Sequence, residues 1–444
     1  MLAERWRAHG AGEEGLLKTP PGAGRFVVAA VAVSALLGTP QVALASPARQ
    51  GQLRLVVTPS VSLSTEPLGI KISGLRAGQR VSLTVTSTDS RGFQWKSLST
   101  YIAGPAGTVS PASSPSNGPS YTGLDAMGPF DFMASYSKSE PAYFWDGNEP
   151  LAFQFEATSG TKTASVSVHR SLGASVTETS EALAKQGFVG KYWAPMVMSR
   201  KKHPAVLLFG GSEGGLVGAL LPATLAAHGY PTLDVAYFKE PGLPQSLADI
   251  PLEYFVKALR WLASRPGVDG HRLWVVGGSR GSEAALLLGV HYPGLVHGVA
   301  ALVPSDVAIC SYPGCAGPAW TFQGNAVPYT RQFDDPHPTD DPAAVIPVAR
   351  IKGPVFLDCG GDDHVWSSCP YAHAIMAELG AAHDPYPHTL IVSQGGGHGS
   401  ALEVPYEPGT AEAEWGTSLA GGTAVANDLA WATQWPRFMD FLNN

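Results

Sequence analysis

Two glycine-flanked serines match the nucleophile elbow, a tight strand-to-helix turn that exposes a reactive serine hydroxyl. The pattern G-x-S-x-G occurs around Ser212 and again around Ser279. Small residues flank the serine because the turn is strained and neighbouring chain segments approach it closely. The chain has 51 glycines, so the pattern alone is weak, with about one-half of a chance match expected. Sequence context must therefore separate the two matches.

Ser279 has the better context for a nucleophile of acyl-transfer chemistry. It follows the apolar run 273–276 and leads into the predicted helix 282–291. In an α/β-hydrolase sheet the nucleophile follows a central strand, and an earlier strand supplies the oxyanion loop. Ser212 follows the first clear strand of this region and is better placed in that loop, at 210–215. The predicted oxyanion donors are the backbone N–H groups of Gly211, Ser212 and Arg280. The alternative for either match is an ordinary glycine turn.

A serine hydroxyl needs a general base, and the base needs an acid that orients it. In α/β-hydrolases the order along the chain is Ser, acid, His. His398 lies in a glycine-rich turn after the last strand-like run, and Asp362 and Asp363 follow the preceding run. Both turns fall at the carboxyl edge of a parallel sheet, where the sites of open α/β sheets lie. Asp358 lies within the strand and could be structural. The less favourably placed histidines are His364, His373, His383 and His388.

Each of these residues also has a plain structural interpretation. Asp362 could be a turn or helix-cap carboxylate, and His398 could be an exposed turn residue. Glu283 is expected either to brace the elbow or to act as a helix N-terminal acid favoured by the helix dipole. The Arg280 side chain is expected to face anionic substrate groups or to lie on the surface.

Two regions of different periodicity must position these residues. Between residues 52 and 170, period-two alternation predicts a half-buried β-sheet or sandwich. The Pro/Gly/Ser-rich stretch 104–120 is expected to be a long loop. After about residue 185, strand-like and helix-like runs alternate, including a predicted helix over 247–264. This alternation predicts a mostly parallel sheet covered by helices on both faces.

Composition excludes several classes of protein. The 444 residues are 44% hydrophobic and 15% charged, with a net charge of −7. Disorder over the whole chain is therefore excluded. No long Lys/Arg run marks a nucleic-acid or anionic-membrane partner. No apolar run reaches the 18 or more residues that a membrane-spanning helix needs. The predicted chemistry requires no metal and no organic cofactor.

The N-terminus has the features of an export signal. The apolar run 26–37 follows Arg25 and precedes Ala43-Leu44-Ala45, the order of a signal peptide with an A-x-A cleavage site. We therefore predict a signal over residues 1–45 and an exported protein. The segment before the apolar run is long and contains glutamates, which a misassigned start codon would explain. The alternative is a cytoplasmic protein with a frayed apolar N-terminus.

Four cysteines are consistent with an oxidising compartment. Disulfides between the local pairs Cys310–Cys315 and Cys359–Cys369 are plausible. The alternative is four buried thiols in a cytosolic enzyme. A zinc site is less favoured, because the spacings do not repeat and no CxxC occurs.

Taken together, these stretches resemble the acyl-CoA thioesterase and bile-acid-CoA:amino-acid N-acyltransferase family. The resemblance covers roughly residues 53–442, at 120–130 (SYTGLDAMGPF), 252–255, 277–283, 361–366 (GDDHVW) and 397–406 (GHGSALEVPY), with Gly421, Gly422 and Trp435 near the end. It implies an immunoglobulin-like β-sandwich at 50–180, an α/β-hydrolase domain at 186–444, Asp363 as the triad acid and His398 as the base. The sequence departs from the family by its predicted export signal, by an insert around 310–320 and by the absence of a C-terminal S-K-L.

The resemblance implies long-chain acyl-CoA substrates and a choice between two reactions. Thioesterases of the family use Ser as nucleophile, whereas the N-acyltransferase branch typically uses Cys, so Ser279 favours transfer to water. We therefore expect a serine hydrolase of acyl thioesters, or an exported carboxylesterase. The alternatives are an acyltransferase acting on an amine or alcohol, and a cell-surface binding protein with an inert hydrolase domain.

Overall fold

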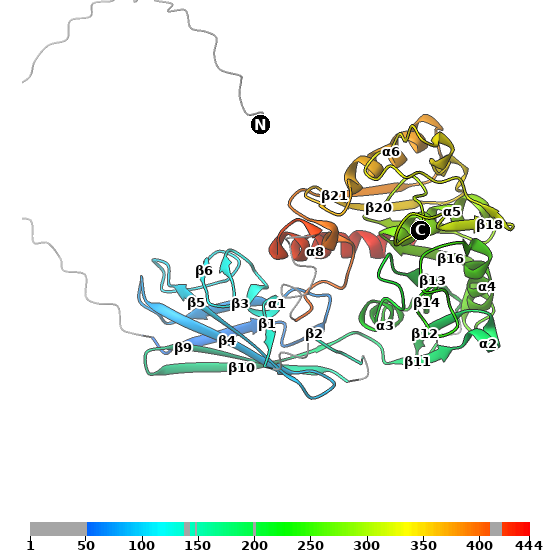
Figure 1. The fold of residues 1–444 in the computed structure, drawn as a ribbon. Coiled ribbons are helices and arrows are strands. Elements are labelled where there is room, and N and C mark those ends of the chain that lie inside the picture. Colours follow the sequence, from blue (N-terminus) through cyan, green and yellow to red (C-terminus); the bar gives the residue numbers. More distant parts are fainter. Residues whose placement is uncertain (1–50, 137–142, 147–148, 199–200, 409–419) are drawn as a thin grey trace, which may run out of the picture. The chain divides into compact units, whose positions relative to one another are not determined.

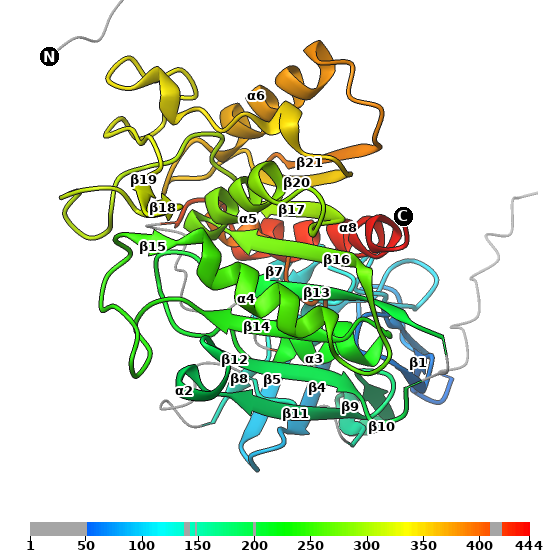
Figure 2. The same cartoon turned by 90° about the vertical axis from the view of Figure 1, so that its right-hand side faces the viewer.

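Eight strands form one sheet in the order β11-β12-β14-β13-β16-β17-β20-β21 (Figure 2). The computed structural model describes residues 51–136, 143–146, 149–198, 201–408 and 420–444. All pairs from β14 to β21 are parallel, whereas β11 and β12 are antiparallel to their neighbours. The strands are β11 (Val176–Glu181), β12 (Val189–Pro195), β13 (His203–Phe209), β14 (Thr232–Ala236), β16 (Val268–Gly278), β17 (Gly298–Leu302), β20 (Val355–Gly360) and β21 (His388–Ser393).

Helices cover both faces of this sheet. Successive side chains of a strand point to opposite faces, so a strand that is apolar throughout has an apolar surface on each face that must be buried. Leu207 and Phe209 of β13 share a hydrophobic core with α4, α5 and α6, whereas Val206 and Leu208 share one with α3 and α8. The helices are α3 (Leu220–Ala227), α4 (Leu252–Ala263), α5 (Arg280–His291), α6 (Ser368–Ala381) and α8 (Ala424–Leu442). The predicted parallel sheet with helices on both faces is confirmed, and it has the α/β-hydrolase arrangement.

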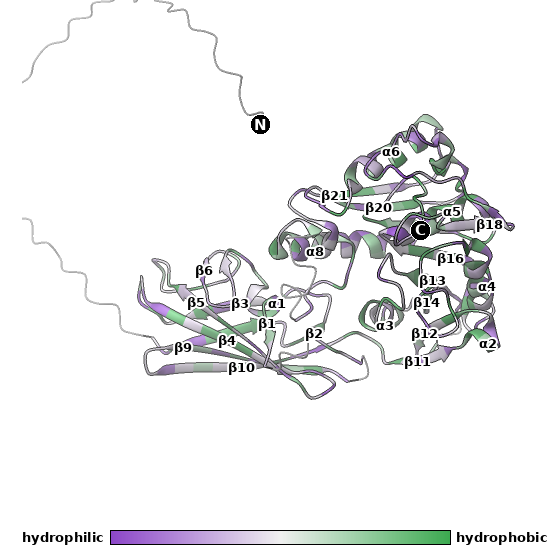
Figure 3. Ribbon diagram, viewed as in Figure 1, coloured by the Kyte–Doolittle hydropathy of each residue, from purple (hydrophilic) through white to green (hydrophobic). Residues whose placement is uncertain are grey.

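Before this sheet, the described part of the chain is almost entirely β, with a single short helix (Figure 1). One sheet has the order β2-β10-β9-β4-β5-β8, and two-stranded sheets pair β1 with β3 and β6 with β7. Hydrophobic and hydrophilic residues alternate along β4 and β10 (Figure 3), as expected for half-buried strands. The bounds are β1 (Arg54–Thr58), β2 (Val61–Leu63), β3 (Gly69–Ser73), β4 (Arg80–Thr88), β5 (Gln94–Ile102), β6 (Ser116–Asn117), β7 (Thr122–Gly123), α1 (Gly128–Asp131), β8 (Ala134–Ser135), β9 (Leu151–Ser159) and β10 (Lys162–Ser171).

Short elements make up the rest of the secondary structure in the described residues. They are α2 (Leu183–Gln186), β15 (Ile250–Pro251), β18 (Trp320–Phe322), β19 (Asn325–Ala326) and the 3-10 turns η1 (Pro342–Ala344), η2 (Val348–Arg350) and η3 (His398–Ser400). β15 pairs with β18 and β18 with β19 in a small third sheet.

Two boundaries differ from the sequence-based expectation. The predicted helix over 247–264 begins only at Leu252, because Ile250 and Pro251 pair with β18, and a residue before proline disfavours the helical conformation. β11 begins at Val176 and belongs to the eight-stranded sheet, although the β-sandwich domain implied by the family resemblance extends to residue 180. The predicted export signal, residues 1–45, lies outside the described residues. Among the described helices, none is long and apolar enough to cross a membrane.

Candidate active site

Ser279 occupies the turn between β16 and α5 in a strained conformation. Its φ is 53°, a value rare for a residue with a side chain and often found at functional sites. A Cβ on Gly277 would lie 2.3 Å from the carbonyl oxygen of Gly281, and a Cβ on Gly281 would lie 2.3 Å from that of Gly210. Glycine is therefore required at both flanking positions, as an elbow demands. Ser212, by contrast, lies in an irregular loop, and α3 begins only at Leu220.

Three side chains from distant parts of the chain form one hydrogen-bonded series. Nε2 of His398 lies 3.0 Å from Oγ of Ser279, and Nδ1 lies 2.9 Å from Oδ2 of Asp363. With the proton on Nδ1, the imidazole donates to the carboxylate and leaves Nε2 to accept from the serine hydroxyl. The indole of Trp366 packs edge-on against the imidazole, with ring centroids 5.6 Å apart. The arrangement can withdraw a proton from Ser279.

The two neighbouring aspartates, which sequence patterns alone could not separate, point in different directions. Asp363 also accepts from the backbone N–H of Val365 at 3.0 Å, which fixes its carboxylate toward His398. The carboxylate of Asp362 lies near His364 and accepts from the N–H of Gly422 at 3.0 Å. Asp363 is therefore the aspartate that can orient the base.

Asp358 has a structural role, as expected from its location within the strand β20. It is fully buried and accepts from the N–H groups of Val303 at 2.8 Å and Leu402 at 3.0 Å. Burial raises its pKa to about 7. It ties the residue after β17 to the segment that follows His398.

The loop after β13 presents backbone groups beside Ser279, but one of the three predicted donors is already engaged. The N–H of Gly211 donates to Oε1 of Glu213 at 2.7 Å. Among the described residues, the N–H groups of Ser212 and Arg280 have no protein acceptor. They are therefore the two predicted donors that remain able to bind an oxyanion.

Two side chains that sequence reasoning missed hold this loop. The hydroxyl of Tyr237 donates to the carbonyl oxygens of Gly210 at 2.8 Å and Gly211 at 3.0 Å. Nζ of Lys239 donates to the carbonyl of Glu213 at 2.9 Å, and lies 3.4 Å from that of Ser212. Both follow β14 at the carboxyl edge of the sheet, so the rule that located His398 could have found them.

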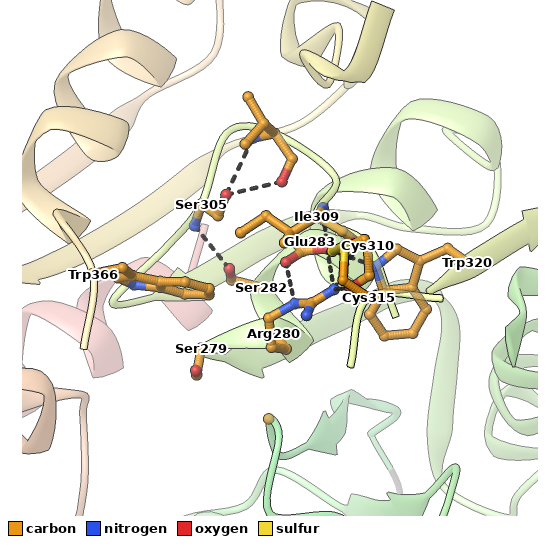
Figure 4. A network of polar contacts seen from close by, with 12 residues as sticks. Ser279, Arg280, Ser282, Glu283, Ser305, Ile309, Cys310, Cys315, Trp320 and Trp366 are labelled. Carbon is orange, nitrogen blue, oxygen red and sulfur yellow. Dashed lines mark hydrogen bonds and ion pairs between the residues drawn. A yellow bond between two sulfur atoms is a disulfide. The ribbon is translucent and has the colours of Figure 1, made fainter. Parts of the chain in front are cut away.

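The Arg280 side chain contradicts both sequence-based expectations, because its guanidinium is buried and bound to protein groups, so it neither faces anionic substrate groups nor lies on the surface. It is buried against Glu283, and its Nη2 donates to the carbonyls of Ile309 at 2.7 Å and Cys310 at 2.9 Å (Figure 4). Glu283 also accepts from the N–H of Ile309 at 3.1 Å and from Nε1 of Trp320 at 2.7 Å. Glu283 therefore binds the side chain of the residue that follows Ser279, and it also lies in the first turn of α5, so the structure is consistent with both of its expected roles.

Both expected disulfides are present, and each closes a loop near Ser279. Cys310 is bonded to Cys315 and Cys359 to Cys369. The first loop carries Tyr312, and the second carries Asp363 and Trp366. The cysteines are thus neither free thiols nor zinc ligands.

A cavity of about 810 Å³ opens onto Ser279 and His398, within the size range of small-molecule sites. Tyr143, Phe144 and Trp145 of the all-β region contribute to its wall. Two carboxylates that sequence reasoning missed also line it, and burial raises the pKa of Glu403 to about 7 and that of Glu407 well above its usual value. The glutamates stood inside the quoted 397–406 stretch or next to it, but nothing in the pattern indicated that they face a cavity.

One cluster among the described residues has donor atoms close enough for a metal ion. Asp125, Asp131 and Asp428 bring carboxylate oxygens within 4.8 Å of one another. None of them lines the cavity at Ser279. Burial and the adjacent Asp428 raise the pKa of Asp131 well above its usual value, so the protonated carboxyl group is favoured there. The cluster is not part of the candidate active site.

The fold and the elbow define an α/β-hydrolase, and comparison with known proteins identifies its family. A model of the acyl-CoA thioester hydrolase/BAAT N-terminal region matches residues 65–181, and one of the BAAT/acyl-CoA thioester hydrolase C-terminal region matches residues 250–444. The chain belongs to this acyl-CoA thioesterase and bile-acid-CoA:amino-acid N-acyltransferase family.

Some relatives are named as N-acyltransferases and others as thioesterases, and both kinds align over most of the chain. Acyl-coenzyme A amino acid N-acyltransferase 2 of Rattus norvegicus is 26% identical over 88% of this chain and 97% of its own length. Acyl-coenzyme A thioesterase 6 of Mus musculus is 26% identical over 85% and 92%. Among solved structures, a putative dienelactone hydrolase from Klebsiella pneumoniae has a TM-score of 0.40 at 14% identity, covering 61% of this chain and 99% of that one.

Proposed function

We propose that this protein is a serine hydrolase of acyl thioesters or esters that acts through an acyl-enzyme. Ser279 Oγ attacks the acyl carbonyl while His398 Nε2 takes its proton, and the leaving thiol or alcohol receives that proton as the tetrahedral intermediate collapses. A water molecule then attacks the acyl-serine, and its proton passes through His398 back to Ser279. The acid is released and the enzyme is restored.

One observation carries this proposal: the imidazole of His398 lies within hydrogen-bond distance of both Ser279 and Asp363. Asp363 holds the tautomer in which Nε2 is the base and stabilises the imidazolium that forms. The N–H groups of Ser212 and Arg280 would bind the oxyanion, and losing one such donor typically costs about 2.7–4 kcal/mol. The names of the relatives support an acyl-CoA thioester as the substrate class.

Transfer to an amine remains the second candidate because relatives from two organisms are named N-acyltransferases. The serine at position 279 favours hydrolysis, as the family resemblance implies.

Export is part of the proposal, since the apolar run 26–37 and Ala43-Leu44-Ala45 precede the all-β region. Sequencing the N-terminus of the mature protein tests this part. A start near residue 46 supports export, and an intact N-terminus supports a cytoplasmic enzyme.

The reaction is tested with the purified chain on acyl-CoA and p-nitrophenyl esters, with and without glycine or taurine. We expect free acid as the product, with activity abolished in Ser279→Ala. A fluorophosphonate should label Ser279, and Ser212→Ala, which keeps its backbone N–H, should still be labelled. Amide formation with added glycine or taurine would indicate the acyltransferase. Absence of both turnover and labelling would indicate an inert binding protein.

A further inference from the structure

Three carboxylates meet in the interior of the protein, away from the cavity at Ser279. Asp125 precedes α1 and Asp131 ends it, whereas Asp428 belongs to α8. Their oxygens lie within 4.8 Å of one another, and the three residues are only 7%, 0% and 5% exposed. Buried charges in proteins are normally paired, hydrogen-bonded or bound to a metal ion. We name these three residues the aspartate cluster.

Hydrogen bonds do not account for the carboxylate at the centre of this cluster. Among the described residues, neither Oδ atom of the fully buried Asp131 has a hydrogen-bond donor. Asp428 lies beside it, but one carboxylate can donate to another only if one of the two carries a proton. Asp125, by contrast, accepts from the N–H of Met127 at 2.9 Å. The side chain of Asp131 is therefore directed into the cluster without a donor of its own.

Arg170 of β10 is a cation close to the cluster, and it is also fully buried. Its Nη2 donates to the carbonyls of Ser64 at 2.5 Å and Glu66 at 2.7 Å. Among the described residues, its Nε and Nη1 have no acceptor. Three carboxylates and one guanidinium leave two negative charges in the interior. A proton on Asp131, which its raised pKa favours, cancels one of them, whereas a divalent cation cancels both.

We propose that the aspartate cluster binds a Ca²⁺ ion, which joins the all-β region to α8. Carboxylate oxygens are the donors that hard cations prefer, and a cluster made only of aspartates disfavours zinc. Two oxygens on one Ca²⁺ ion lie at most about 5 Å apart, because each metal–oxygen distance is roughly 2.3–2.6 Å. The spacing within the cluster fits this limit. Water completes the coordination shell and accepts from the free N–H groups of Arg170.

An ion at this place would also support the turn that carries His398. Asn427, which precedes Asp428 on α8, accepts from the N–H of Gly397 at 2.9 Å. Gln434 of the same helix donates to the carbonyl of Ser400 at 2.8 Å. Fixing α8 to the all-β region therefore fixes the helix that holds the turn on both sides of His398. The ion has a structural role and takes no part in the reaction at Ser279.

Thermal unfolding of the full chain, after treatment with EDTA, tests the site. CaCl₂, MgCl₂ or NaCl is added at matched ionic strength. We expect Ca²⁺ at a hundred-fold excess over its Kd to raise Tm by about 3 °C, and calorimetric titration to give a single binding event. Asp131→Asn and Asp428→Asn should abolish both effects. Because Asn keeps the shape of Asp and removes a buried charge, Asp131→Asn should not lower the Tm of the EDTA-treated protein.

Asp440→Asn is the matched control, because Asp440 is an exposed aspartate on the same helix. Its response to Ca²⁺ should equal that of the wild type. A wild-type Tm that Ca²⁺ shifts no more than NaCl does would overturn the inference, since a proton alone would then neutralise the cluster. An equal shift in the wild type and Asp131→Asn would also overturn it, because the ion would bind elsewhere. A shift with Mg²⁺ but not with Ca²⁺ would reject Ca²⁺ as the occupant.

Discussion

Arg280 and Glu283, one helical turn apart, form an ion pair in which only 2% and 0% of the two side chains reach solvent. The pair joins the first turn of α5 to the loop at Ile309 and Cys310. Because the N–H of Arg280 is a proposed oxyanion donor, the pair fixes the backbone that would carry this donor.

Glu283→Ala should destabilise the fold by about 3–5 kcal/mol, because it leaves the buried guanidinium of Arg280 without its counter-charge. Urea unfolding measures the change. Glu178→Ala is the matched control, because Glu178 pairs with Lys191 near the surface, where an ion pair contributes at most about 1 kcal/mol. An equal loss of unfolding free energy in the two variants would show that the buried ion pair contributes no more to stability than the surface pair.

Asp363→Asn should lower kcat by roughly 10⁴, the size of effect expected when the orienting acid is lost and the imidazole takes the wrong tautomer. KM should change little, since Asp363 contacts His398 and not the substrate. Steady-state kinetics on a short p-nitrophenyl ester measures both values. Asp362→Asn is the matched control and should retain most activity, because its carboxylate faces His364 and Gly422. A reversed order would assign the acid to Asp362.

Tyr237→Phe should lower kcat about ten-fold, because the hydroxyl that holds the carbonyls of Gly210 and Gly211 is lost. KM and the free energy of unfolding should change far less than kcat. Fluorophosphonate inactivation provides a second readout, since slower labelling is expected if the loop stabilises negative charge. If KM and kcat changed together with the midpoint of unfolding, the tyrosine would have only a packing role.

Asp306→Asn should stabilise the protein at neutral and alkaline pH by about 1–3 kcal/mol, because Oδ1 of this buried carboxyl has no hydrogen-bond partner. Burial raises the pKa of Asp306 from 3.8 to about 8. The folded state therefore keeps this proton between pH 4 and 8 while the unfolded chain releases it, so the wild type loses stability as the pH rises through this range. Urea unfolding from pH 4 to 9 should show a smaller loss in the variant. Parallel curves would contradict the raised pKa.

The order of the reactive residues and the class of fold could be predicted from the sequence, because they depend on local patterns. Glycines at 277 and 281 are needed by the turn itself, and alternating strands and helices lead to a parallel sheet whose carboxyl edge collects Ser279, Asp363 and His398. The periodicity of hydrophobic residues and the order of motifs along the chain, however, predict only the course of the backbone. They could not separate Asp363 from Asp362 without the family resemblance, since both follow the same strand.

Tertiary structure decided the contacts that depend on side-chain direction. It turned the Arg280 guanidinium inward to Glu283, engaged the Gly211 N–H with Glu213, and brought Tyr237, Lys239 and Trp366 to the site from other strands and loops. It also placed Tyr312, Phe333 and Val365 around one cavity. Such contacts join residues that are distant along the chain, and their geometry is set by packing between elements that no local pattern records.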